Sequence, residues 1–254
     1  DTNDIRKQMN SIDSIQNELF EMIGRLKSGG MRLEDTMNTK YADMVDYYTM
    51  WVHQIKTPIA SMHLILQKED SEDSRRLRAE LFRVEQYVQM VLCFLRLDSD
   101  FTDYVIKEYR VDDIIRPAVR RLAPQFIMKK LALEYEHTDE VALTDEKWLG
   151  FVVEQVLSNA VKYTSSGSIS IKCDGDRLVI SDTGIGIAAE DLPRIFDKGY
   201  TGFNGRADRK ASGIGLYLCR RICDKLGHSI RAESVAGQGT TITIGLGRNR
   251  LEVE

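Results

Sequence analysis

The amino-acid sequence predicts an α+β protein, in which a helical hairpin that dimerises into a four-helix bundle is followed by an α/β sandwich domain. Apolar residues recur at helical spacing through the first 97 residues, interrupted by a polar stretch at 69–74. After a second polar stretch at 98–103, short alternating apolar runs are interspersed with helical segments. Such a change of pattern is typical of a helical domain joined to a layered domain of helices and strands.

The composition narrows the class of protein. The sequence is 43% hydrophobic and 29% charged, which suits an ordinary globular chain. The formal net charge of -4 and the lack of a basic run argue against direct binding of nucleic acid. No apolar run approaches the ~20 residues of a membrane-spanning helix, and no signal peptide is visible. Because the chain begins with Asp1, we expect it to be a fragment of a longer protein.

The cysteines predict core positions. Cys93, Cys173, Cys219 and Cys223 form no CxxC pair and show no zinc-finger spacing with a histidine. Cys219 and Cys223 lie one helical turn apart, so a shared metal ion is one interpretation. We favour burial as small core residues, which is common for free cysteine. A reducing compartment fits this interpretation.

Residues 1–31 predict an N-terminal helix or signalling coiled coil. The heptad positions, in alternating steps of four and three, are Ile5, Met9, Ile12, Gln16, Leu19, Ile23 and Leu26. We favour a parallel coiled coil over a single amphipathic helix because the apolar seam is narrow. Gly29 and Gly30 together cost about 2 kcal/mol of helix propensity relative to alanine. Ser28–Gly30 is therefore interpreted as a break, a hinge or a junction with added sequence.

Residues 32–97 predict the dimerisation hairpin. Its first helix runs from about Arg32 to Lys68 and contains Pro58, a residue that kinks helices. After a turn at 69–74, the second helix has an apolar stripe formed by Leu77, Leu81, Val84, Val88, Val91 and Leu95. One hairpin would expose too much of this stripe to be stable alone. We therefore expect a homodimer in which two hairpins pair into a four-helix bundle.

The linker at 98–103 leads into a second domain at 104–254. Strands are expected at 104–109, 131–135, 168–172, 177–181, 229–234 and 240–245. Helices are expected at 111–130, at 146–163 and at 213–226. The middle helix begins after Thr144-Asp145-Glu146, which is typical of an N-cap followed by an acidic first turn.

Two glycine-containing segments of this domain suit a bound ligand. Asp182-Thr183-Gly184-Ile185-Gly186 follows an expected strand, and its aspartate can accept a hydrogen bond from an exocyclic amine such as that of adenine. The same letters also occur in tight turns and in aspartic proteases. Gly213-Ile214-Gly215-Leu216 opens an expected helix, and helix N-termini suit phosphate. Turn chemistry explains that segment equally well.

A third segment lies on the helix that ends near residue 163. Asn159 and Lys162 are three residues apart and therefore share a helix face. An asparagine oxygen suits Mg²⁺ and a lysine suits phosphate. Without the other segments, an ordinary solvated face would explain the pair.

The order of these segments is more specific than any one of them. Asn159-x-x-Lys162-Tyr163, Asp182-x-Gly184-x-Gly186, Gly213-x-Gly215-Leu216 and Gly237-Gln238-Gly239-Thr240 resemble the N, G1, G2 and G3 boxes of the histidine kinase/Hsp90/gyrase/MutL superfamily. The segment at 194–199, which contains Phe196, resembles the F box. Residues 199–212 would then be the ATP lid.

The resemblance implies ATP and Mg²⁺ as cofactors and gives the boxes their roles. Asn159 would hold Mg²⁺, Lys162 would contact phosphate and Tyr163 would pack at the nucleotide. Asp182 would bind the adenine amine, supported by Thr240. The remaining nucleotide-binding positions would be Gly184, Gly186, Phe196, Gly213, Gly215 and Leu216, with lid cations at Arg206, Arg209 or Lys210.

One position separates kinases from hydrolases in this superfamily. The ATPases carry a glutamate base four residues before the metal-binding asparagine, and Gln155 stands at that position here. Glutamine has no basic lone pair near neutral pH, so it cannot activate water as a general base. An ATP-driven clamp of the Hsp90 or MutL kind is therefore the least favoured alternative.

Trp51-Val52-His53-Gln54-Ile55-Lys56-Thr57-Pro58 resembles the H box of sensor histidine kinases, in particular the intramembrane-sensing subgroup linked to peptide-antibiotic responses. The resemblance implies that His53 is the phosphoacceptor, because imidazole is a competent nucleophile at neutral pH. Most kinases of this class carry an acidic residue directly after the histidine, whereas Gln54 stands here. Thr57, one turn further on, matches a position that helps to orient water for phosphatase activity.

The sequence is therefore identified as a member of the sensor histidine kinases. The resemblance implies ATP-dependent autophosphorylation on His53, phosphoryl transfer to an aspartate of a response regulator, and phosphatase activity toward that regulator. A phosphatase-dominant or non-catalytic module of the same fold is the second alternative. Gln54 stands where an acidic residue is usual, and Gln155 stands where histidine kinases usually carry asparagine. We expect a cytoplasmic fragment of a bacterial membrane protein, with a membrane sensor or transporter as a further partner.

Overall fold

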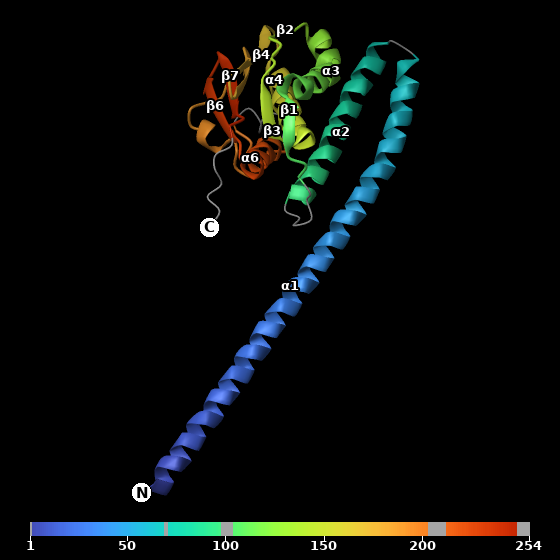
Figure 1. The fold of residues 1–254 in the computed structure, drawn as a ribbon. Coiled ribbons are helices and arrows are strands. Elements are labelled where there is room, and N and C mark those ends of the chain that lie inside the picture. The colour runs from blue at the N-terminus through green and yellow to red at the C-terminus, as the bar shows by residue number, and fades with distance from the viewer. Residues whose placement is uncertain (1, 69–70, 98–103, 203–211, 248–254) are drawn as a thin grey trace. The chain divides into compact units, whose positions relative to one another are not determined.

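The computed structural model describes residues 2–68, 71–97, 104–202 and 212–247, with the side chains of the first helix described from residue 19 onward (Figure 1). The chain divides into two compact units, residues 1–58 and 59–254, and the boundary between them falls within this helix. The expected domain boundaries at 31, 97 and 103 stay predictions. Within the described residues, no helix is long and apolar enough to cross a membrane.

The first helix, α1, is continuous from Thr2 to Gln67. A break in the helix at Ser28–Gly30 is therefore wrong, whereas a hinge there stays a prediction. Gly29 and Gly30 weaken the helix locally, but a helix that is formed on both sides of a weak position propagates through it, since nucleation is the costly step. Pro58 lies inside α1 as expected. The heptad residues Leu19, Ile23 and Leu26 are exposed along this helix, and the coiled coil stays a prediction.

The second helix, α2, runs from Glu72 to Leu97, so the expected turn at 69–74 extends too far. Ser71 causes the early start, because its Oγ accepts a hydrogen bond from the backbone N–H of Ser74 at 3.1 Å. The predicted apolar stripe divides into two sets. Leu81, Val88 and Leu95 are buried, whereas Leu77, Val84 and Val91 are 56%, 45% and 42% exposed. The exposed set repeats every seven residues, which suits packing against a second hairpin.

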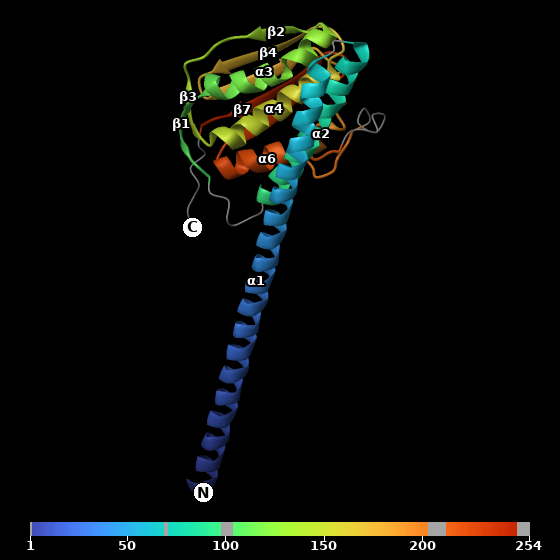
Figure 2. The same cartoon turned by 90° about the vertical axis from the view of Figure 1, so that its right-hand side faces the viewer.

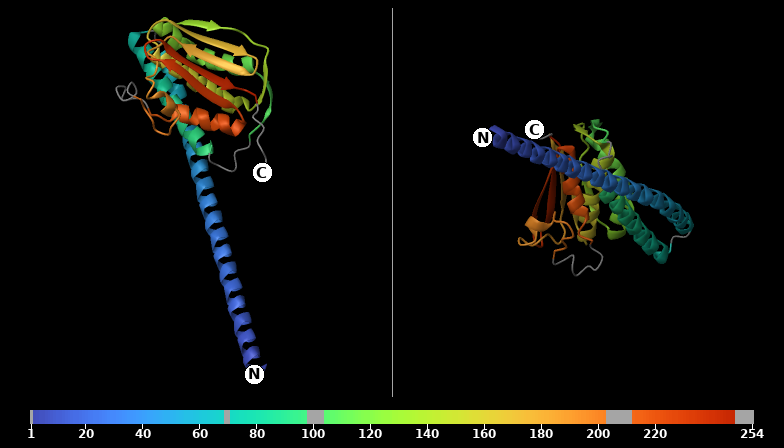
Figure 3. Two further views of the ribbon diagram at one scale, coloured as in Figure 1. Left: turned by 90° about the vertical axis from the view of Figure 1, so that its left-hand side faces the viewer. Right: turned by 90° about the horizontal axis from the view of Figure 1, so that it is seen from below.

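A five-stranded mixed sheet forms one layer of the second unit, with the strand order β2-β4-β5-β7-β6. The strands are β2 (Ala132–Tyr135), β4 (Ser168–Asp174), β5 (Arg177–Asp182), β6 (Ser229–Val235) and β7 (Gly239–Gly245). Strands β2 and β4 pair in parallel and the other neighbours are antiparallel. Figure 3, left, shows the face of this sheet that the helices leave uncovered.

Three helices, α3 (Val111–Lys129), α4 (Glu146–Tyr163) and α6 (Gly215–Leu226), form the other layer (Figure 2). Alternation along the strands directs apolar side chains toward these helices. The buried strand residues include Ile169, Ile171, Leu178, Ile180 and Ile244. They form one core with helix residues such as Leu149 and Leu218, which confirms the predicted α/β sandwich.

The sequence pattern located strand β1 (Lys107–Arg110) only in part, and it did not predict strand β3 (Val141–Thr144) or the 3₁₀ turn η1 (Leu192–Arg194). Strand β1 pairs antiparallel with β3. Both missed elements are too short to show a period of their own.

The cysteines lie where the favoured interpretation puts them. Cys93, Cys219 and Cys223 are buried in the core, and Cys173 is half-buried. Burial raises the pKa of the Cys93 and Cys223 thiols to about 12, so these groups stay neutral. In the described part of the chain, no group of three or more His, Cys, Asp or Glu side chains could hold a metal ion.

Candidate active site

A cavity of about 220 Å³ lies beside α4, at the ends of β5 and β7 and at the start of α6. The predicted site residues that line it are Asn159, Lys162, Tyr163, Asp182, Gly186, Gly213, Gly215, Leu216 and Thr240. These residues come from four separate segments of the chain, so the fold brings the predicted boxes together. Gly184 and Phe196 do not line the cavity.

Helix α4 is fixed at both of its ends. At the N-terminus, Asp145 Oδ1 accepts hydrogen bonds from the backbone N–H groups of Lys147 at 2.9 Å and Trp148 at 3.1 Å. At the C-terminus, Lys129 Nζ donates to three backbone carbonyls, those of Val161, Lys162 and Thr164, at 2.6, 3.0 and 3.0 Å. A cation at this end complements the helix dipole. The Lys129 contacts fix the turn that carries Lys162.

Gln155 contacts Asn159, the predicted metal ligand. Its Nε2 donates to Asn159 Oδ1 at 3.4 Å, one turn further along α4. A Cβ added to Gly215 would meet Gln155 Cδ at 2.8 Å, so the glutamine amide lies between α4 and the start of α6. An amide in this place orients the asparagine but offers no base.

Asp182 ends strand β5 opposite Thr240 of β7. Its Oδ1 accepts a hydrogen bond from the backbone N–H of Gly184 at 2.8 Å. Burial raises the pKa of the Asp182 carboxyl, although backbone N–H groups of Gly184 and Thr240 oppose that shift. A partly buried carboxylate with defined partners suits recognition of one donor on a ligand.

The loop after Asp182 packs closely against α4 and β6, and two glycines make this approach feasible. The Ile185 N–H donates to the Tyr163 carbonyl at 3.2 Å. A Cβ at Gly184 would lie 2.5 Å from that same carbonyl oxygen and 2.8 Å from Asp182 Oδ1. Gly186 has a φ of 65°, a left-handed conformation that glycine adopts without strain. Gly184 therefore positions Asp182 although it does not line the cavity.

The predicted lid begins and ends at two paired glycines. The N–H of Gly199 donates to the carbonyl of Gly213 at 3.0 Å, and Tyr200 OH donates to Asp191 Oδ1 at 2.5 Å. Tyr200 and Asp191 both line the cavity. The lid cations proposed from the sequence, Arg206, Arg209 and Lys210, lie outside the described residues.

Phe196 packs against the hydrophobic core, with the Arg220 guanidinium 5.8 Å from its ring centre. The neighbouring Ile195 lines the cavity in its place. The F-box pattern therefore locates this segment, but not the side chain that faces the cavity. On a segment this short, periodicity cannot distinguish adjacent residues.

Helix α2 forms one wall of the cavity, which the sequence analysis missed. Arg83, Gln86, Tyr87 and Met90 line it. Their spacing of three and four residues marks one helix face. That signal was available in the sequence, but periodicity does not say which surface such a face meets.

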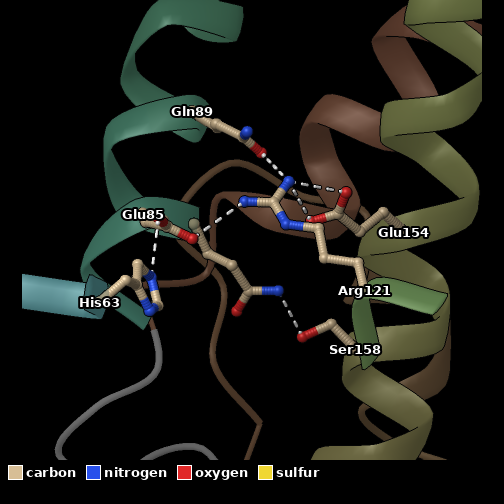
Figure 4. A network of polar contacts seen from close by, with 7 residues as sticks. His63, Glu85, Gln89, Arg121, Glu154 and Ser158 are labelled. Atoms are coloured by element: carbon tan, nitrogen blue, oxygen red, sulfur yellow. Dashed lines mark hydrogen bonds and ion pairs between the residues drawn. The ribbon is translucent and has the colours of Figure 1, made fainter. Parts of the chain in front are cut away.

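A polar cluster centred on Arg121 of α3 joins α2 to α3 and α4 (Figure 4). The guanidinium contacts Glu85 Oε2 at 3.3 Å, Gln89 Oε1 at 3.1 Å and both Glu154 oxygens at 3.0 Å. His63 Nε2 lies 3.2 Å from the other oxygen of Glu85. Burial raises the pKa of the Glu154 carboxyl, and Arg121 opposes that shift. Glu154 is therefore bound in this cluster.

The residues of the H box lie on α1 in the first unit. His53, Gln54 and Thr57 are all exposed. The Thr57 hydroxyl donates to the His53 carbonyl at 3.5 Å, so the two residues share one helix face as predicted.

The fold and the cavity define the class of protein. Residues 144–250 match the family model of the histidine kinase-, DNA gyrase B-, and HSP90-like ATPases. The solved structure of the histidine kinase AdeS from Acinetobacter baumannii shares the fold, with a TM-score of 0.52 at 20% identity over 78% of this chain and 98% of that one.

Two curated relatives narrow this class further. The chain is 34% identical to the sensor histidine kinase YxdK of Bacillus subtilis, over 89% of this chain and 71% of that protein. It is 33% identical to the sensor protein BceS of Halalkalibacterium halodurans, over 91% of this chain and 69% of that protein. The chain belongs to the sensor histidine kinases, in the intramembrane-sensing subgroup. It is an ATP-dependent protein-histidine kinase that autophosphorylates, with dimerisation and a response regulator as partner.

Substitution of Gly184 by alanine tests how closely the Asp182 loop is packed. Because the added Cβ would crowd the Tyr163 carbonyl and the Asp182 carboxylate, we expect Gly184→Ala to lower the free energy of unfolding by about 1–3 kcal/mol. Urea unfolding followed by circular dichroism measures this.

Gly150→Ala is the matched control for this prediction. Gly150 lies inside α4, and its added Cβ would meet only Ile114 Cγ2, at 3.9 Å. We expect this variant to gain up to about 1 kcal/mol from helix propensity. Equal stabilities of the two variants would contradict the close packing at Gly184.

Proposed function

We propose that His53 is the phosphoacceptor and that ATP binds in the cavity beside α4. The observation that carries the proposal is the gathering of residues from four separate boxes around one cavity. In this arrangement Asp182 accepts a hydrogen bond from the adenine amine, and Asn159 and Lys162 lie at the phosphates. Gly213, Gly215 and Leu216 border the triphosphate at the start of α6, whose N–H groups favour anions.

Asn159 suits a magnesium ion that is held mostly by its nucleotide. Its Oδ1 is an oxygen ligand oriented by Gln155. Mg²⁺ is commonly bound by one or two protein oxygens together with substrate phosphates and water. This agrees with the lack, among the described residues, of a group of three or more acidic, histidine or cysteine ligands. When bound, Mg²⁺ would offset the charge of the phosphates.

The phosphoryl transfer is an in-line displacement. A ring nitrogen of His53, which we take to be Nε2, forms a bond to the γ-phosphorus while the bond between that phosphorus and the bridging oxygen of ADP breaks. The imidazole loses its other ring proton to solvent water, which reaches His53 because the residue is exposed. Gln54 can orient the ring by a hydrogen bond but cannot accept this proton. Lys162 stabilises the charge of the transferring group.

The same site disfavours hydrolysis of ATP. Gln155, at the position of the hydrolase base, donates its amide to Asn159. The neighbouring carboxylate, Glu154, is bound by Arg121 on another side of α4. With both side chains engaged, α4 offers water no general base near Asn159. This supports a kinase over an ATP-driven clamp.

We further infer that the parent protein lies in the bacterial cell membrane and that this chain is a cytoplasmic part of it, working with a membrane sensor or transporter. The resemblance of the H box to the intramembrane-sensing kinases supports this inference. The exposed heptad set of Leu77, Val84 and Val91 supports dimerisation through the helical hairpin.

Labelling with radioactive ATP tests the phosphoacceptor. We expect the 254-residue chain to acquire a label that is lost in acid, because phosphohistidine has a labile P–N bond, and we expect His53→Ala to acquire none. His63→Gln, on the same helix, should retain the label. An acid-stable label, or a label that persists in His53→Ala, would overturn the assignment.

The raised pKa of Asp182 predicts a pH dependence for adenine binding. Only the ionised carboxylate is a strong acceptor, so we expect the affinity for adenosine to fall as the pH drops toward this raised pKa, above the ordinary aspartate value of about 3.9. Adenosine is the probe because it has no phosphate that titrates. Calorimetry between neutral pH and about pH 5 measures the effect.

Asp182→Asn is the control for this pH dependence. We expect it to bind adenosine weakly at every pH. A carboxyl whose pKa is raised by folding is destabilising when ionised, so this variant should be at least as stable as the wild type at neutral pH. A pH profile that the substitution leaves unchanged would exclude Asp182 as the titrating group.

A second activity, dephosphorylation of the response regulator, is supported by Thr57. The residue shares an exposed helix face with His53. We expect Thr57→Ala to slow dephosphorylation of the phosphorylated regulator by about 10²-fold, the scale of a positioned catalytic group. Autophosphorylation should be retained. Thr57→Ser keeps the hydroxyl and should keep the phosphatase rate; equal rates in all three proteins would reject the role.

A further inference from the structure

The packing of α2 on α4 has a defined register, and polar contacts at two successive levels define it (Figure 4). At the first level, Gln89 of α2 and Glu154 of α4 both bind Arg121. At the second, Gln86 Nε2 donates to Ser158 Oγ at 2.8 Å. A step of three residues back along α2 therefore corresponds to a step of four residues forward along α4, so the two helices run in opposite directions here.

Extending this register by one level brings two cations opposite each other. One more step back along α2 reaches Arg83, and one more step forward along α4 reaches Lys162. Both residues line the cavity, as do Ser212 and Gly213 at the start of the G2 box. Asp182, the expected adenine ligand, lies on another element, at the end of β5. The hydrogen bond from Gln86 to Ser158 places the α2 wall beside the turn of α4 that carries Asn159.

The guanidinium of Arg83 forms an ion pair with an exposed residue of its own helix. Its Nη1 contacts Glu80 on the same helix at 3.0 and 3.3 Å, and that pair is solvent-facing, with Glu80 59% exposed. The Arg83 side chain itself is only 28% exposed. An exposed pair three residues apart on a helix contributes little, so a stronger anion in the cavity would compete for the guanidinium.

We propose that Arg83 of α2 binds the phosphates of the nucleotide, so that the dimerisation hairpin contributes a residue to the nucleotide site. The proposal rests on binding of ATP in this cavity. A guanidinium matches phosphate oxygens bidentately, and such charge-assisted hydrogen bonds are among the strong ones. Two cations, Arg83 and Lys162, then face the phosphates from two helices. Nucleotide occupancy and docking of α2 stabilise one another as a consequence.

Arg121 acts in this arrangement as a positioning residue. It binds carboxylates of both helices, Glu85 on α2 and Glu154 on α4, and thereby sets the register that brings Arg83 to the level of Lys162. Its planar fork of donors suits simultaneous contact with several acceptors.

The test is the affinity of the whole 254-residue chain for AMPPNP with magnesium, measured by calorimetry. We expect Arg83→Ala to weaken AMPPNP binding about 10-fold or more, since a charge-assisted hydrogen bond is lost, and to leave adenosine binding unchanged. Arg83→Lys should recover part of the affinity. Wild-type affinity for AMPPNP in Arg83→Ala, or an equal loss for adenosine, would overturn the proposal.

Two controls on α2 separate phosphate binding from a loss of helix stability. Arg76→Ala removes another intrahelical ion pair, Arg76–Glu72 at 2.7 Å, away from the cavity, and should bind AMPPNP as the wild type does. Glu80→Ala breaks the Arg83 pair but leaves the guanidinium, and should not weaken binding. A loss in Glu80→Ala equal to that in Arg83→Ala would assign the effect to the helix and reject the proposal.

The role of Arg121 is tested by non-additivity. In an Arg121→Met background, we expect the added Arg83→Ala change to cost much less AMPPNP affinity than it does alone. We expect the same in Ser158→Ala, which removes the contact with Gln86 between the same two helices and leaves no charge unpaired. Arg120→Ala, at an exposed neighbour on α3, is the control and should leave the cost of Arg83→Ala intact. Full additivity in both backgrounds would reject the positioning role. A wild-type chain that binds neither AMPPNP nor adenosine would instead refute the nucleotide site itself.

Discussion

The fixation of α4 at both ends is the constraint on which the site depends. Asp145 caps the helix and also accepts a hydrogen bond from the backbone N–H of Val105 at 2.8 Å, which anchors the start of the α/β sandwich. Lys129 binds the carbonyls at the opposite end, and burial lowers the pKa of its ammonium group. Between these ends, one face of α4 packs on the sheet through residues such as Leu157, while another presents Asn159 and Lys162. Because both ends of α4 are fixed, the helix cannot rotate, and each of its side chains keeps one direction.

The sheet positions Asp182, the second part of the site. Strand β5 ends at Asp182, and its pairing with Thr240 places the carboxylate at the edge of the cavity. The close approach of the following loop to the Tyr163 carbonyl joins the sheet to α4. Because backbone atoms make this junction, the side chains at positions 184 and 186 must be absent, which is why glycine stands at both.

The charged cluster at Arg121 couples the helical hairpin to the ATP-binding layer. Its guanidinium neutralises carboxylates from two helices, which would otherwise repel each other in a half-buried environment. The same guanidinium binds Glu154, the acidic neighbour of Gln155. In this ion pair the Glu154 carboxylate is not available as a general base for a water molecule. One arginine thus contributes both to the docking of α2 and to the kinase character of the site.

Local sequence determined much of this protein. The N-cap at Asp145 and the alternation along β4, β5 and β7 predicted the sandwich, because each depends on neighbours within one segment. The order of the boxes, through its resemblance to a known superfamily, predicted nine residues that line the cavity. Tertiary structure decided the rest. Helix α1 continues through Gly29 and Gly30. Ile195 lines the cavity in place of Phe196, and α2 forms one wall of that cavity. Periodicity defines which face of a helix is apolar or polar, but only packing in three dimensions selects the surface that this face meets.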